Sequence, residues 1–208
     1  MYQLLPAEEK HLDQIVPLMA STGYWEAGLR RNTLNLTTHQ FIREYIAKPN
    51  LPFTTVLTPK DKKNKALGIL TCGSKDELES SSVDYGEHIP TEVKHLFKNL
   101  FTFEISNSYH IAFLALNKSC RGEGLGIKLM ALAEKKWKES QMDTLSLYTF
   151  SCQTSAIKLY LKAGMMVAKA INVEEKVPCP CVLYFEKNLR TESLHNFFES
   201  PAYQNITF

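Results

Sequence analysis

The sequence predicts one α/β domain over residues 1–208, and three observations support this. A chain of 208 residues is long enough to bury a full core and short enough to form one domain. Its 44% hydrophobic and 22% charged content is that of an ordinary globular protein. Short apolar runs typical of strands alternate with segments whose apolar residues recur every three or four positions, as in helices.

The N-terminal part of the chain contains two predicted helices and three predicted strands. Helical spacing indicates one helix carrying Leu12, Ile15, Val16 and Met19, and a second over Thr38–Ala47 that ends before Pro49. The predicted strands are Tyr2–Pro6, Phe53–Thr58 and Ala66–Cys72. The basic turn Pro59–Lys65 would join the last two as a solvated hairpin loop.

Strands and helices alternate in the C-terminal part. The predicted strands are Ile111–Leu116, Thr144–Phe150, Met166–Val173 and Val182–Glu186. One helix is expected from Gly124 to about Ser140, and another around Tyr160. Ile111–Leu116 is apolar without alternation, which predicts a central strand buried on both faces.

The most informative segment is Tyr109–Gly126, in which this strand turns sharply into a helix. Gly122, Gly124 and Gly126 occupy every second position, so the backbone can pack closely and adopt positive φ. A glycine turn that opens a helix leaves several backbone N–H groups unpaired beside the positive end of the helix dipole. The segment therefore predicts an anion site, most often for a phosphate, although a purely structural glycine turn is the alternative.

Two common phosphate-binding motifs do not fit this loop. The pattern G-x-x-x-x-G-K-[ST] is absent, and the glycine spacing is not that of a dinucleotide fingerprint. The pattern R-x-x-G-x-G is matched in full by Arg121, Gly124 and Gly126. At these residues the chain resembles the GNAT superfamily of acyl-CoA-dependent N-acetyltransferases, in which the motif holds the pyrophosphate of coenzyme A.

A second segment resembles the same superfamily, whose second motif is N-x-x-A-x-x-x-Y-x-x-x-G-[FM]. Ala156, Tyr160 and Gly164 are in register with it, and Gln153 replaces the usual Asn. Gly164 lies where a left-handed helix cap is expected. The resemblance implies a mixed and mostly antiparallel sheet of about seven strands, flanked by helices and splayed between strands 4 and 5.

The resemblance also implies that acetyl-CoA is a cosubstrate. Arg121 and the N–H groups from Gly122 to Lys128 would surround the pyrophosphate, and the backbone of Leu114 and Leu116 would pair with pantetheine. Gln153 would contact one arm of the cofactor or simply begin its helix. The predicted cofactor-binding residues are Leu114, Ala115, Leu116, Arg121, Gly122, Glu123, Gly124, Leu125, Gly126, Ile127, Lys128, Gln153, Ala156 and Tyr160.

Two catalytic residues are predicted. Tyr160 would donate to the leaving sulfur, although its spacing is also that of an aromatic residue on the core face of a helix. His110 occupies the place where histone acetyltransferases of the superfamily carry a glutamate base. An imidazole with a pKa of ~6.5 can accept the proton of an amine, although other branches use water chains and a lone His is often a core residue. Glu104 and Tyr109 are alternative bases.

The predicted function is transfer of the acetyl group of acetyl-CoA to a primary amine, by direct attack in a ternary complex. By resemblance, Tyr24, Trp25 and Glu26 line the acceptor cleft, and the acceptor is a small molecule or a peptide. The alternative is a catalytically silent acyl-CoA-binding regulatory module, because the motif Asn and the base Glu are both replaced.

Two further segments lie outside the two motifs. Residues 73–108 read as a helical acidic insertion, either a solvated excursion or a lid whose carboxylates attract an amine cation. Residues 190–208 form an aromatic C-terminal extension, expected to pack onto the body or onto a second subunit of a homodimer.

Composition excludes several other classes. A net charge of +2 gives no indication of nucleic-acid binding, and the lack of an 18-residue apolar run argues against a membrane span. No secretory signal is recognisable, and the five cysteines are scattered, which predicts free thiols in the cytoplasm. No metal site is expected, because Cys179 and Cys181 are separated by one residue and have no nearby His.

Overall fold

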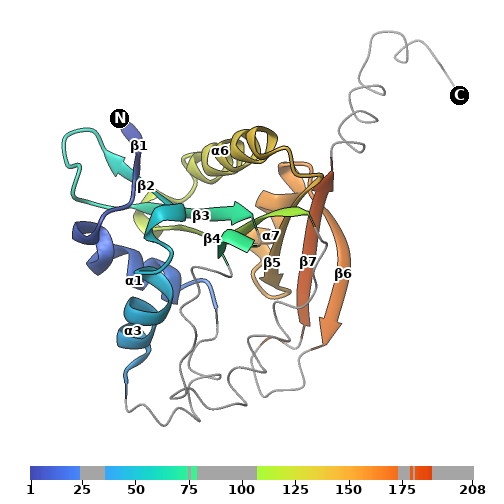
Figure 1. Cartoon of the computed structure of the whole chain (residues 1–208), viewed down its shortest axis with the longest axis horizontal. Helices are drawn as coiled ribbons and strands as arrows, with labels where there is room; N and C mark the ends of the chain where they lie inside the picture. The colour runs from blue at the N-terminus through green and yellow to red at the C-terminus, as the bar shows by residue number, and fades with distance from the viewer. Residues whose placement is uncertain (24–35, 75, 79–106, 173–178, 180, 189–208) are drawn as a thin grey trace, which may run out of the picture.

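The computed structural model describes residues 1–23, 36–74, 76–78, 107–172, 179 and 181–188. Seven strands form one sheet in the order β1-β2-β3-β4-β5-β7-β6. Every neighbouring pair is antiparallel except β4 and β5, which run parallel. The predicted mixed, mostly antiparallel sheet flanked by helices is therefore confirmed (Figure 1).

The predicted strands are all present. Their bounds are β1 Tyr2–Pro6, β2 Thr54–Pro59, β3 Gly68–Ser74, β4 Ser108–Leu116, β5 Thr144–Phe150, β6 Met166–Asn172 and β7 Cys181–Asn188. The described helices are α1 Leu12–Ala20, α3 Thr38–Phe41, the π-helical η2 Ile42–Ala47, α6 Leu125–Ser140 and α7 Thr154–Lys162. Short 3-10 turns η1, η3 and η4 cover Glu9–His11, Leu51–Phe53 and Lys118–Cys120.

Two hydrophobic clusters cover opposite faces of the sheet. On one face, the buried side chains of α6, with Trp137 and Leu129 fully enclosed, pack with Tyr160 of α7 against β3, β4, β5 and β7. On the other face, α1, α3 and η2 pack against β2, β3 and Ala115 of β4. Because side chains alternate along a strand, β4 contributes to both clusters.

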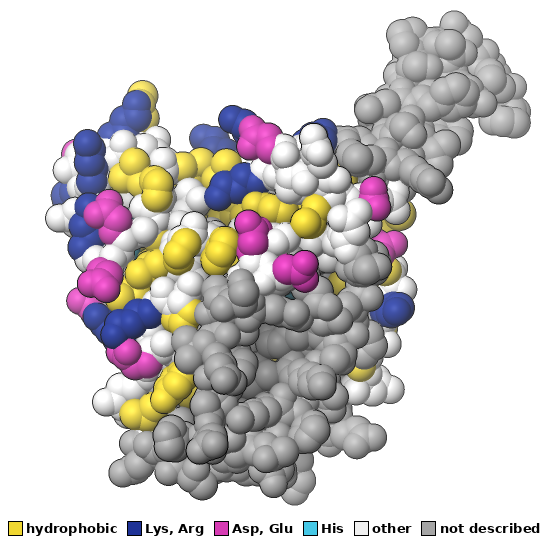
Figure 2. All heavy atoms as spheres, viewed as in Figure 1, with side chains coloured by type: hydrophobic (Ala, Val, Ile, Leu, Met, Phe, Trp, Pro, Cys, Tyr) yellow, Lys and Arg dark blue, Asp and Glu magenta, His cyan; other side chains and the backbone are white. Residues whose placement is uncertain are grey.

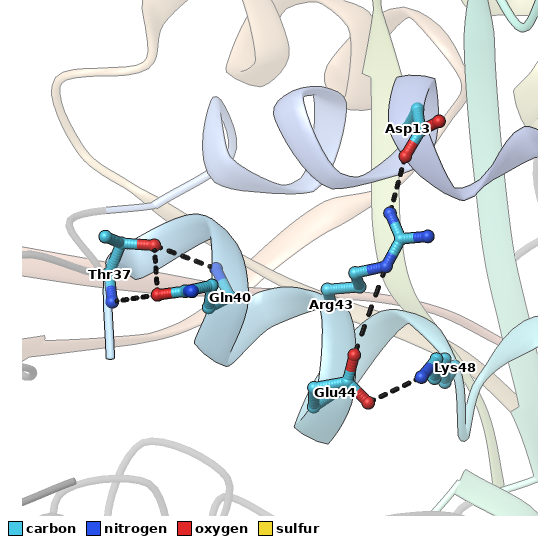
Figure 3. Close-up of polar contacts among 6 residues, drawn as sticks. All are labelled: Asp13, Thr37, Gln40, Arg43, Glu44 and Lys48. Carbon is cyan, nitrogen blue, oxygen red and sulfur yellow. Dashed lines mark hydrogen bonds and ion pairs between the residues drawn. The ribbon is translucent and has the colours of Figure 1, made fainter. Parts of the chain in front are cut away.

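Polar contacts fix the small helical layer on the second face (Figure 3). The side chains of Thr37 and Gln40 form a capping box at the start of α3, which satisfies backbone N–H groups that the helix leaves unpaired. Arg43 of η2 donates to Asp13 of α1 over 2.6 Å, and Lys48 pairs with Glu44. These pairs are largely exposed, so we expect each to add less than about 1 kcal/mol.

The sheet opens between β4 and β5. Their pairing covers Ser108–Ile111 of β4, where Ile111 faces Leu147, although β4 continues to Leu116 and β5 to Phe150. The predicted splay is thus present. The prediction that Ile111–Leu116 is buried on both faces is wrong: Ile111 and Ala115 are buried, but the other four residues are only half-buried. An apolar run could not show that the strand loses its neighbour after Ile111.

Several predicted segments lie outside the described residues. They are the acceptor-cleft residues Tyr24, Trp25 and Glu26, most of the 73–108 insertion including Glu104, and the extension 190–208. None of the helices in the described part of the chain has the length and apolar character needed to cross a membrane. In the face drawn in Figure 2, basic and acidic side chains are intermixed across the described surface.

Candidate active site

The glycine loop presents a set of free backbone donors. Gly122 and Gly124 have φ of +88° and +74°, and a Cβ at either position would meet nothing within 4 Å. Gly124 is the N-cap of α6, and no side chain caps this end of the helix. The first N–H groups of α6 therefore lack intrahelical partners, and they point out of the loop beside the positive end of a 16-residue helix. This geometry favours an anion.

Neighbouring contacts hold the loop in this form. Tyr2 of β1 donates its hydroxyl to the carboxylate of Glu123 over 2.9 Å, which gives the one acidic side chain of the loop a partner. At Gly126, a Cβ would lie 3.1 Å from Leu159 of α7. The small residue at this position therefore lets the start of α6 approach α7 closely, so the two motif segments pack directly against each other.

The edge of β4 beyond Ile111 lies next to the loop. The N–H of Asn117 donates to Leu67 on the β3 side, and successive residues of a strand point their N–H groups in opposite directions. The N–H groups of Leu114 and Leu116 therefore point toward the open edge. Arg121 supports this orientation, because its Nε donates to the carbonyl of Leu116 over 3.3 Å. An extended ligand could pair with this edge as an added strand.

Ala115 does not join this edge. Its side chain is buried in the cluster beneath α1, and by the same alternation its N–H points toward β3. Of the other predicted cofactor residues, Arg121 and Lys128 are exposed beside the loop, Leu125 is buried in the core, and Ile127 and Ala156 are half-buried.

Tyr160 is held at the end of α7. The helix ends in a Schellman motif, in which Gly164 has φ of +78°, Gly164 N–H donates to Leu161 and Met165 N–H donates to Tyr160. The ring of Tyr160 is 6% exposed and packs edge-on against Phe185 with centroids 5.5 Å apart. Burial raises the pKa of Tyr160 to about 12, so its hydroxyl remains a proton donor at neutral pH.

Gln153 has a different partner from those expected. Its side-chain Nε2 donates to the backbone carbonyl of Thr22 over 2.7 Å, and it makes no side-chain cap to α7. The side chain therefore ties the start of α7 to the residues that follow α1. Sequence alone gave no indication of this contact, because the two residues are 131 positions apart.

His110 belongs to a polar and aromatic group on the α1 side of the sheet. Its Nδ1 lies 2.9 Å from the hydroxyl oxygen of Ser146, its register partner in β5. Its ring lies 5.1 Å from that of Tyr148, which in turn lies 5.2 Å from the ring of Tyr184. Burial lowers the pKa of His110 to about 4, so the imidazole is neutral at pH 7.

Tyr109, an alternative base, points the other way. It is buried in the cluster beneath α6, where its hydroxyl donates to Cys72 over 3.7 Å. Burial raises its pKa strongly, so the phenol keeps its proton. Of the two residues, His110 is the better placed beside the point where β4 and β5 separate.

Two of the five cysteines are bonded to each other. Cys152 and Cys179 form a disulfide, with Cα atoms 5.7 Å apart although the two residues are 27 positions apart in sequence. The prediction of five free thiols is therefore wrong for these two, whereas Cys72, Cys120 and Cys181 are free. The odd count and irregular spacing concealed the pair, which the antiparallel register of β5 and β7 brings together. Within the described residues, no three His, Cys, Asp or Glu side chains gather to hold a metal ion.

Comparison with known proteins identifies the family. The sequence model of the acetyltransferase (GNAT) family matches residues 61–165, which include the glycine loop, α6 and α7. This match spans half of the chain, and the chain belongs to this family. No curated protein is similar enough in sequence to give a significant match.

Solved structures share the fold at low sequence identity. An N-acetyltransferase from Staphylococcus aureus Mu50 has 17% identity and a TM-score of 0.66, over 89% of this chain and all of the other. The NatC complex bound to Gag peptide and CoA has 15% identity and a TM-score of 0.61, over 90% of this chain and 98% of the other. The ribosomal-protein-S18-alanine N-acetyltransferase from Escherichia coli has 12% identity and a TM-score of 0.56, with both chains covered completely.

Proposed function

We propose that the protein transfers the acetyl group of acetyl-CoA to a primary amine by direct attack within a ternary complex. The observation that carries this proposal is the open edge of β4 running into a loop of unpaired backbone donors. An anion site and a strand edge placed end to end suit a ligand with a diphosphate and an extended amide-containing arm.

The residues of the loop and strand fit acetyl-CoA. Gly122 and Gly124 keep the space above the loop clear, because no Cβ stands there. The N–H groups from Gly122 to Ile127 and the guanidinium of Arg121 would hold the diphosphate, whereas the Lys128 N–H already donates to the carbonyl of Gly124 over 3.3 Å. The backbone of Leu114 and Leu116 would pair with the pantetheine arm. Bound in this way, acetyl-CoA supplies an activated thioester.

Tyr160 is the proposed acid. A thiol with a pKa of ~8.5 leaves more readily when a hydroxyl donates to the developing thiolate. In the folded protein Tyr160 is protonated at every pH at which a thioester transfer would be measured, because its pKa is raised to about 12. Its hydroxyl has no hydrogen-bond partner among the described residues, so it is free to donate to a ligand.

His110 is the second proposed catalytic residue. Its position on β4, one residue before the pairing with β5 ends, would put it beside the attacking amine and the thioester. It is neutral at pH 7 and could accept a proton or donate a hydrogen bond. As a base it would be weak, since an imidazole of pKa about 4 binds a proton far less tightly than an alkyl amine of pKa ~10.4. The proton of the attacking amine would therefore pass to water.

The acceptor class is proposed as a small amine or a peptide. Two proteins of similar fold favour a peptide or protein acceptor: the NatC complex is described with a bound Gag peptide and CoA, and the S18-alanine enzyme is named for an alanine of a ribosomal protein. Tyr24, Trp25 and Glu26 remain the proposed acceptor-cleft residues.

The decisive experiment is release of free CoA thiol from acetyl-CoA in the presence of a panel of alkyl amines, polyamines and short peptides. Thiol release that depends on one class of amine would support the proposal. Binding of acetyl-CoA in calorimetry without amine-dependent release would instead support the silent acyl-CoA-binding module. Absence of binding would contradict both.

A further inference from the structure

A buried hydrogen-bonding group lies behind His110. Ser146 is 1% exposed, and its hydroxyl oxygen faces Nδ1 of His110 at 2.9 Å. Tyr184 of β7 is 2% exposed, and its hydroxyl oxygen is buried without a hydrogen-bond partner among the described residues. Tyr184 pairs with Tyr148, two residues along from Ser146, so both side chains lie on the same face of the sheet.

Ser146 is a candidate partner for the Tyr184 hydroxyl. Burial raises the pKa of Tyr184, and the Ser146 hydroxyl acts on this pKa in the opposite direction, so the two groups are close. Their separation in this structure falls short of hydrogen-bond geometry. A buried hydroxyl proton without an acceptor is costly, so a small rotation that joins the two groups would be favoured.

The protons of this group can be counted. If Tyr184 donates to Ser146 and Ser146 donates to Nδ1, every buried O–H has an acceptor, and the ring proton of neutral His110 must be on Nε2. If Nδ1 donates to Ser146 instead, Ser146 either donates to Tyr184 or accepts from both groups, and one hydroxyl proton, that of Tyr184 or that of Ser146, then has no acceptor within the group. The first arrangement is the more stable one.

We propose that Ser146 and Tyr184 are positioning residues that fix His110 in the Nε2–H form, so that His110 acts as a neutral hydrogen-bond donor in the active site. This inference rests on the proposed function. In its role, Nε2–H would donate to the thioester oxygen as that oxygen gains negative charge. A neutral imidazole can polarise a carbonyl group in this way, and it does so without accepting the amine proton.

The groups around the ring are compatible with this role. The partner of His110 in β3 is Gly73, and the acidic group beside it is Glu77, whose carboxylate lies 3.3 Å from the place of a Cβ on Gly73 and accepts the N–H of Ser74. From β5 the ring faces Ser146 and Tyr148, and from β7 Tyr184 and Glu186 lie on the same face. Nε2 has no hydrogen-bond partner in the described part of the chain, so it is the nitrogen available to a ligand.

The first test reads the tautomer directly, without activity. Two-bond ¹H–¹⁵N spectra of the ¹⁵N-labelled protein at pH 7 would show six histidines, and the signal lost in His110→Gln identifies His110. We expect a protonated Nε2 and an unprotonated Nδ1. In Ser146→Ala the tautomer ratio should shift by about tenfold toward Nδ1–H, the effect of one hydrogen bond, whereas Ser146→Thr should restore it. A protonated Nδ1 in the unmodified protein would overturn the inference.

The second test separates a donor from a base. In His110→Gln an amide N–H can take the place of Nε2–H, whereas His110→Glu supplies a carboxylate base and no donor. With acetyl-CoA and butylamine or a short peptide, we expect His110→Gln to remain within about tenfold of the unmodified rate. His110→Glu should lose about 100-fold to 1,000-fold, the range for removing one such donor. A His110→Glu variant faster than His110→Gln would contradict a donor role.

Tyr184→Phe provides a further check on the buried group. Removing its hydroxyl should reduce the preference for Nε2–H while leaving acetyl-CoA affinity unchanged, and an unaltered tautomer ratio would exclude Tyr184 from the arrangement. The proposed function and the proposed positioning of His110 can be refuted independently. If no amine promotes thiol release, the proposed function fails, but the spectra still report the tautomer. If release occurs and Nδ1 is protonated, only the positioning inference fails.

Discussion

Replacing Gly124 by Asp should remove acetyl-CoA binding while the fold is retained. The new side chain has room, because a Cβ at this position meets nothing within 4 Å. Its backbone cost is about 1 kcal/mol, since φ is +74° and Asp tolerates the left-handed region better than most residues. The carboxylate would stand among the N–H groups that are proposed to hold the diphosphate.

The electrostatic penalty can be estimated from Coulomb's law. One carboxylate at ~6 Å from one phosphate charge, with an effective dielectric constant of ~20, costs about 3 kcal/mol. This corresponds to a loss of affinity of about 100-fold, and a second phosphate charge would increase it. Added salt should reduce the penalty, because the loop is exposed.

Gly124→Asn is the matched control. Asn has nearly the same shape and the same tolerance of positive φ, so the difference between the two variants isolates the charge. Calorimetry with acetyl-CoA should give a dissociation constant about 100-fold higher for Gly124→Asp than for Gly124→Asn. Urea unfolding should show equal stability for the two variants. Equal affinities would refute the assignment of the loop as the diphosphate site.

Four other predictions follow from single contacts. Tyr160→Phe should lower kcat more than acetyl-CoA affinity, and an undiminished kcat would exclude Tyr160 as the acid. In the unmodified protein this group should cause no loss of rate below about pH 11, because its pKa is raised to about 12. The pKa of His110 is lowered to about 4, so between pH ~6.5 and 4 its imidazole binds a proton in the unfolded chain but not in the folded protein. The free energy of unfolding should therefore fall as the pH drops from ~6.5 to about 4. His110→Gln should reduce this pH dependence in urea titrations. Gln153→Ala should lower the free energy of unfolding by about 1 kcal/mol, because the hydrogen bond from Gln153 to the carbonyl of Thr22 is lost. Calorimetry should show an unchanged affinity for acetyl-CoA, and a large loss of affinity would show that Gln153 contacts the cofactor. Reduction of the Cys152–Cys179 disulfide should lower the free energy of unfolding by about 3.5 kcal/mol for a loop of this length, and Cys152→Ser should unfold identically with and without reductant.

The sequence predicted those features that depend on local pattern. The strands and helices followed from apolar periodicity, and the end of α7 followed from Gly164, whose positive φ the chain needs there. The glycine loop was recognisable because all of its motif residues lie within one short stretch of the sequence. The splay between β4 and β5 came from the family resemblance, since nothing in Ile111–Leu116 shows where a neighbouring strand leaves.

Features that depend on long-range contact could not be predicted. The Gln153 side chain reaches Thr22, and Cys152 meets Cys179, only because the register of the sheet brings these segments together. Ser146 and Tyr184 behind His110 were missed for the same reason. For Ser146 the signal was the alternation in β5, where Thr144, Ser146 and Tyr148 are separated by leucines, and it becomes informative once the strand order is known.

A crystal structure with coenzyme A bound tests the central claim most directly. We predict that its diphosphate accepts hydrogen bonds from the backbone N–H groups from Gly122 to Ile127, and that its pantetheine arm pairs with β4 at Leu114 and Leu116. Coenzyme A bound at any other place, with these N–H groups left free, would contradict the account.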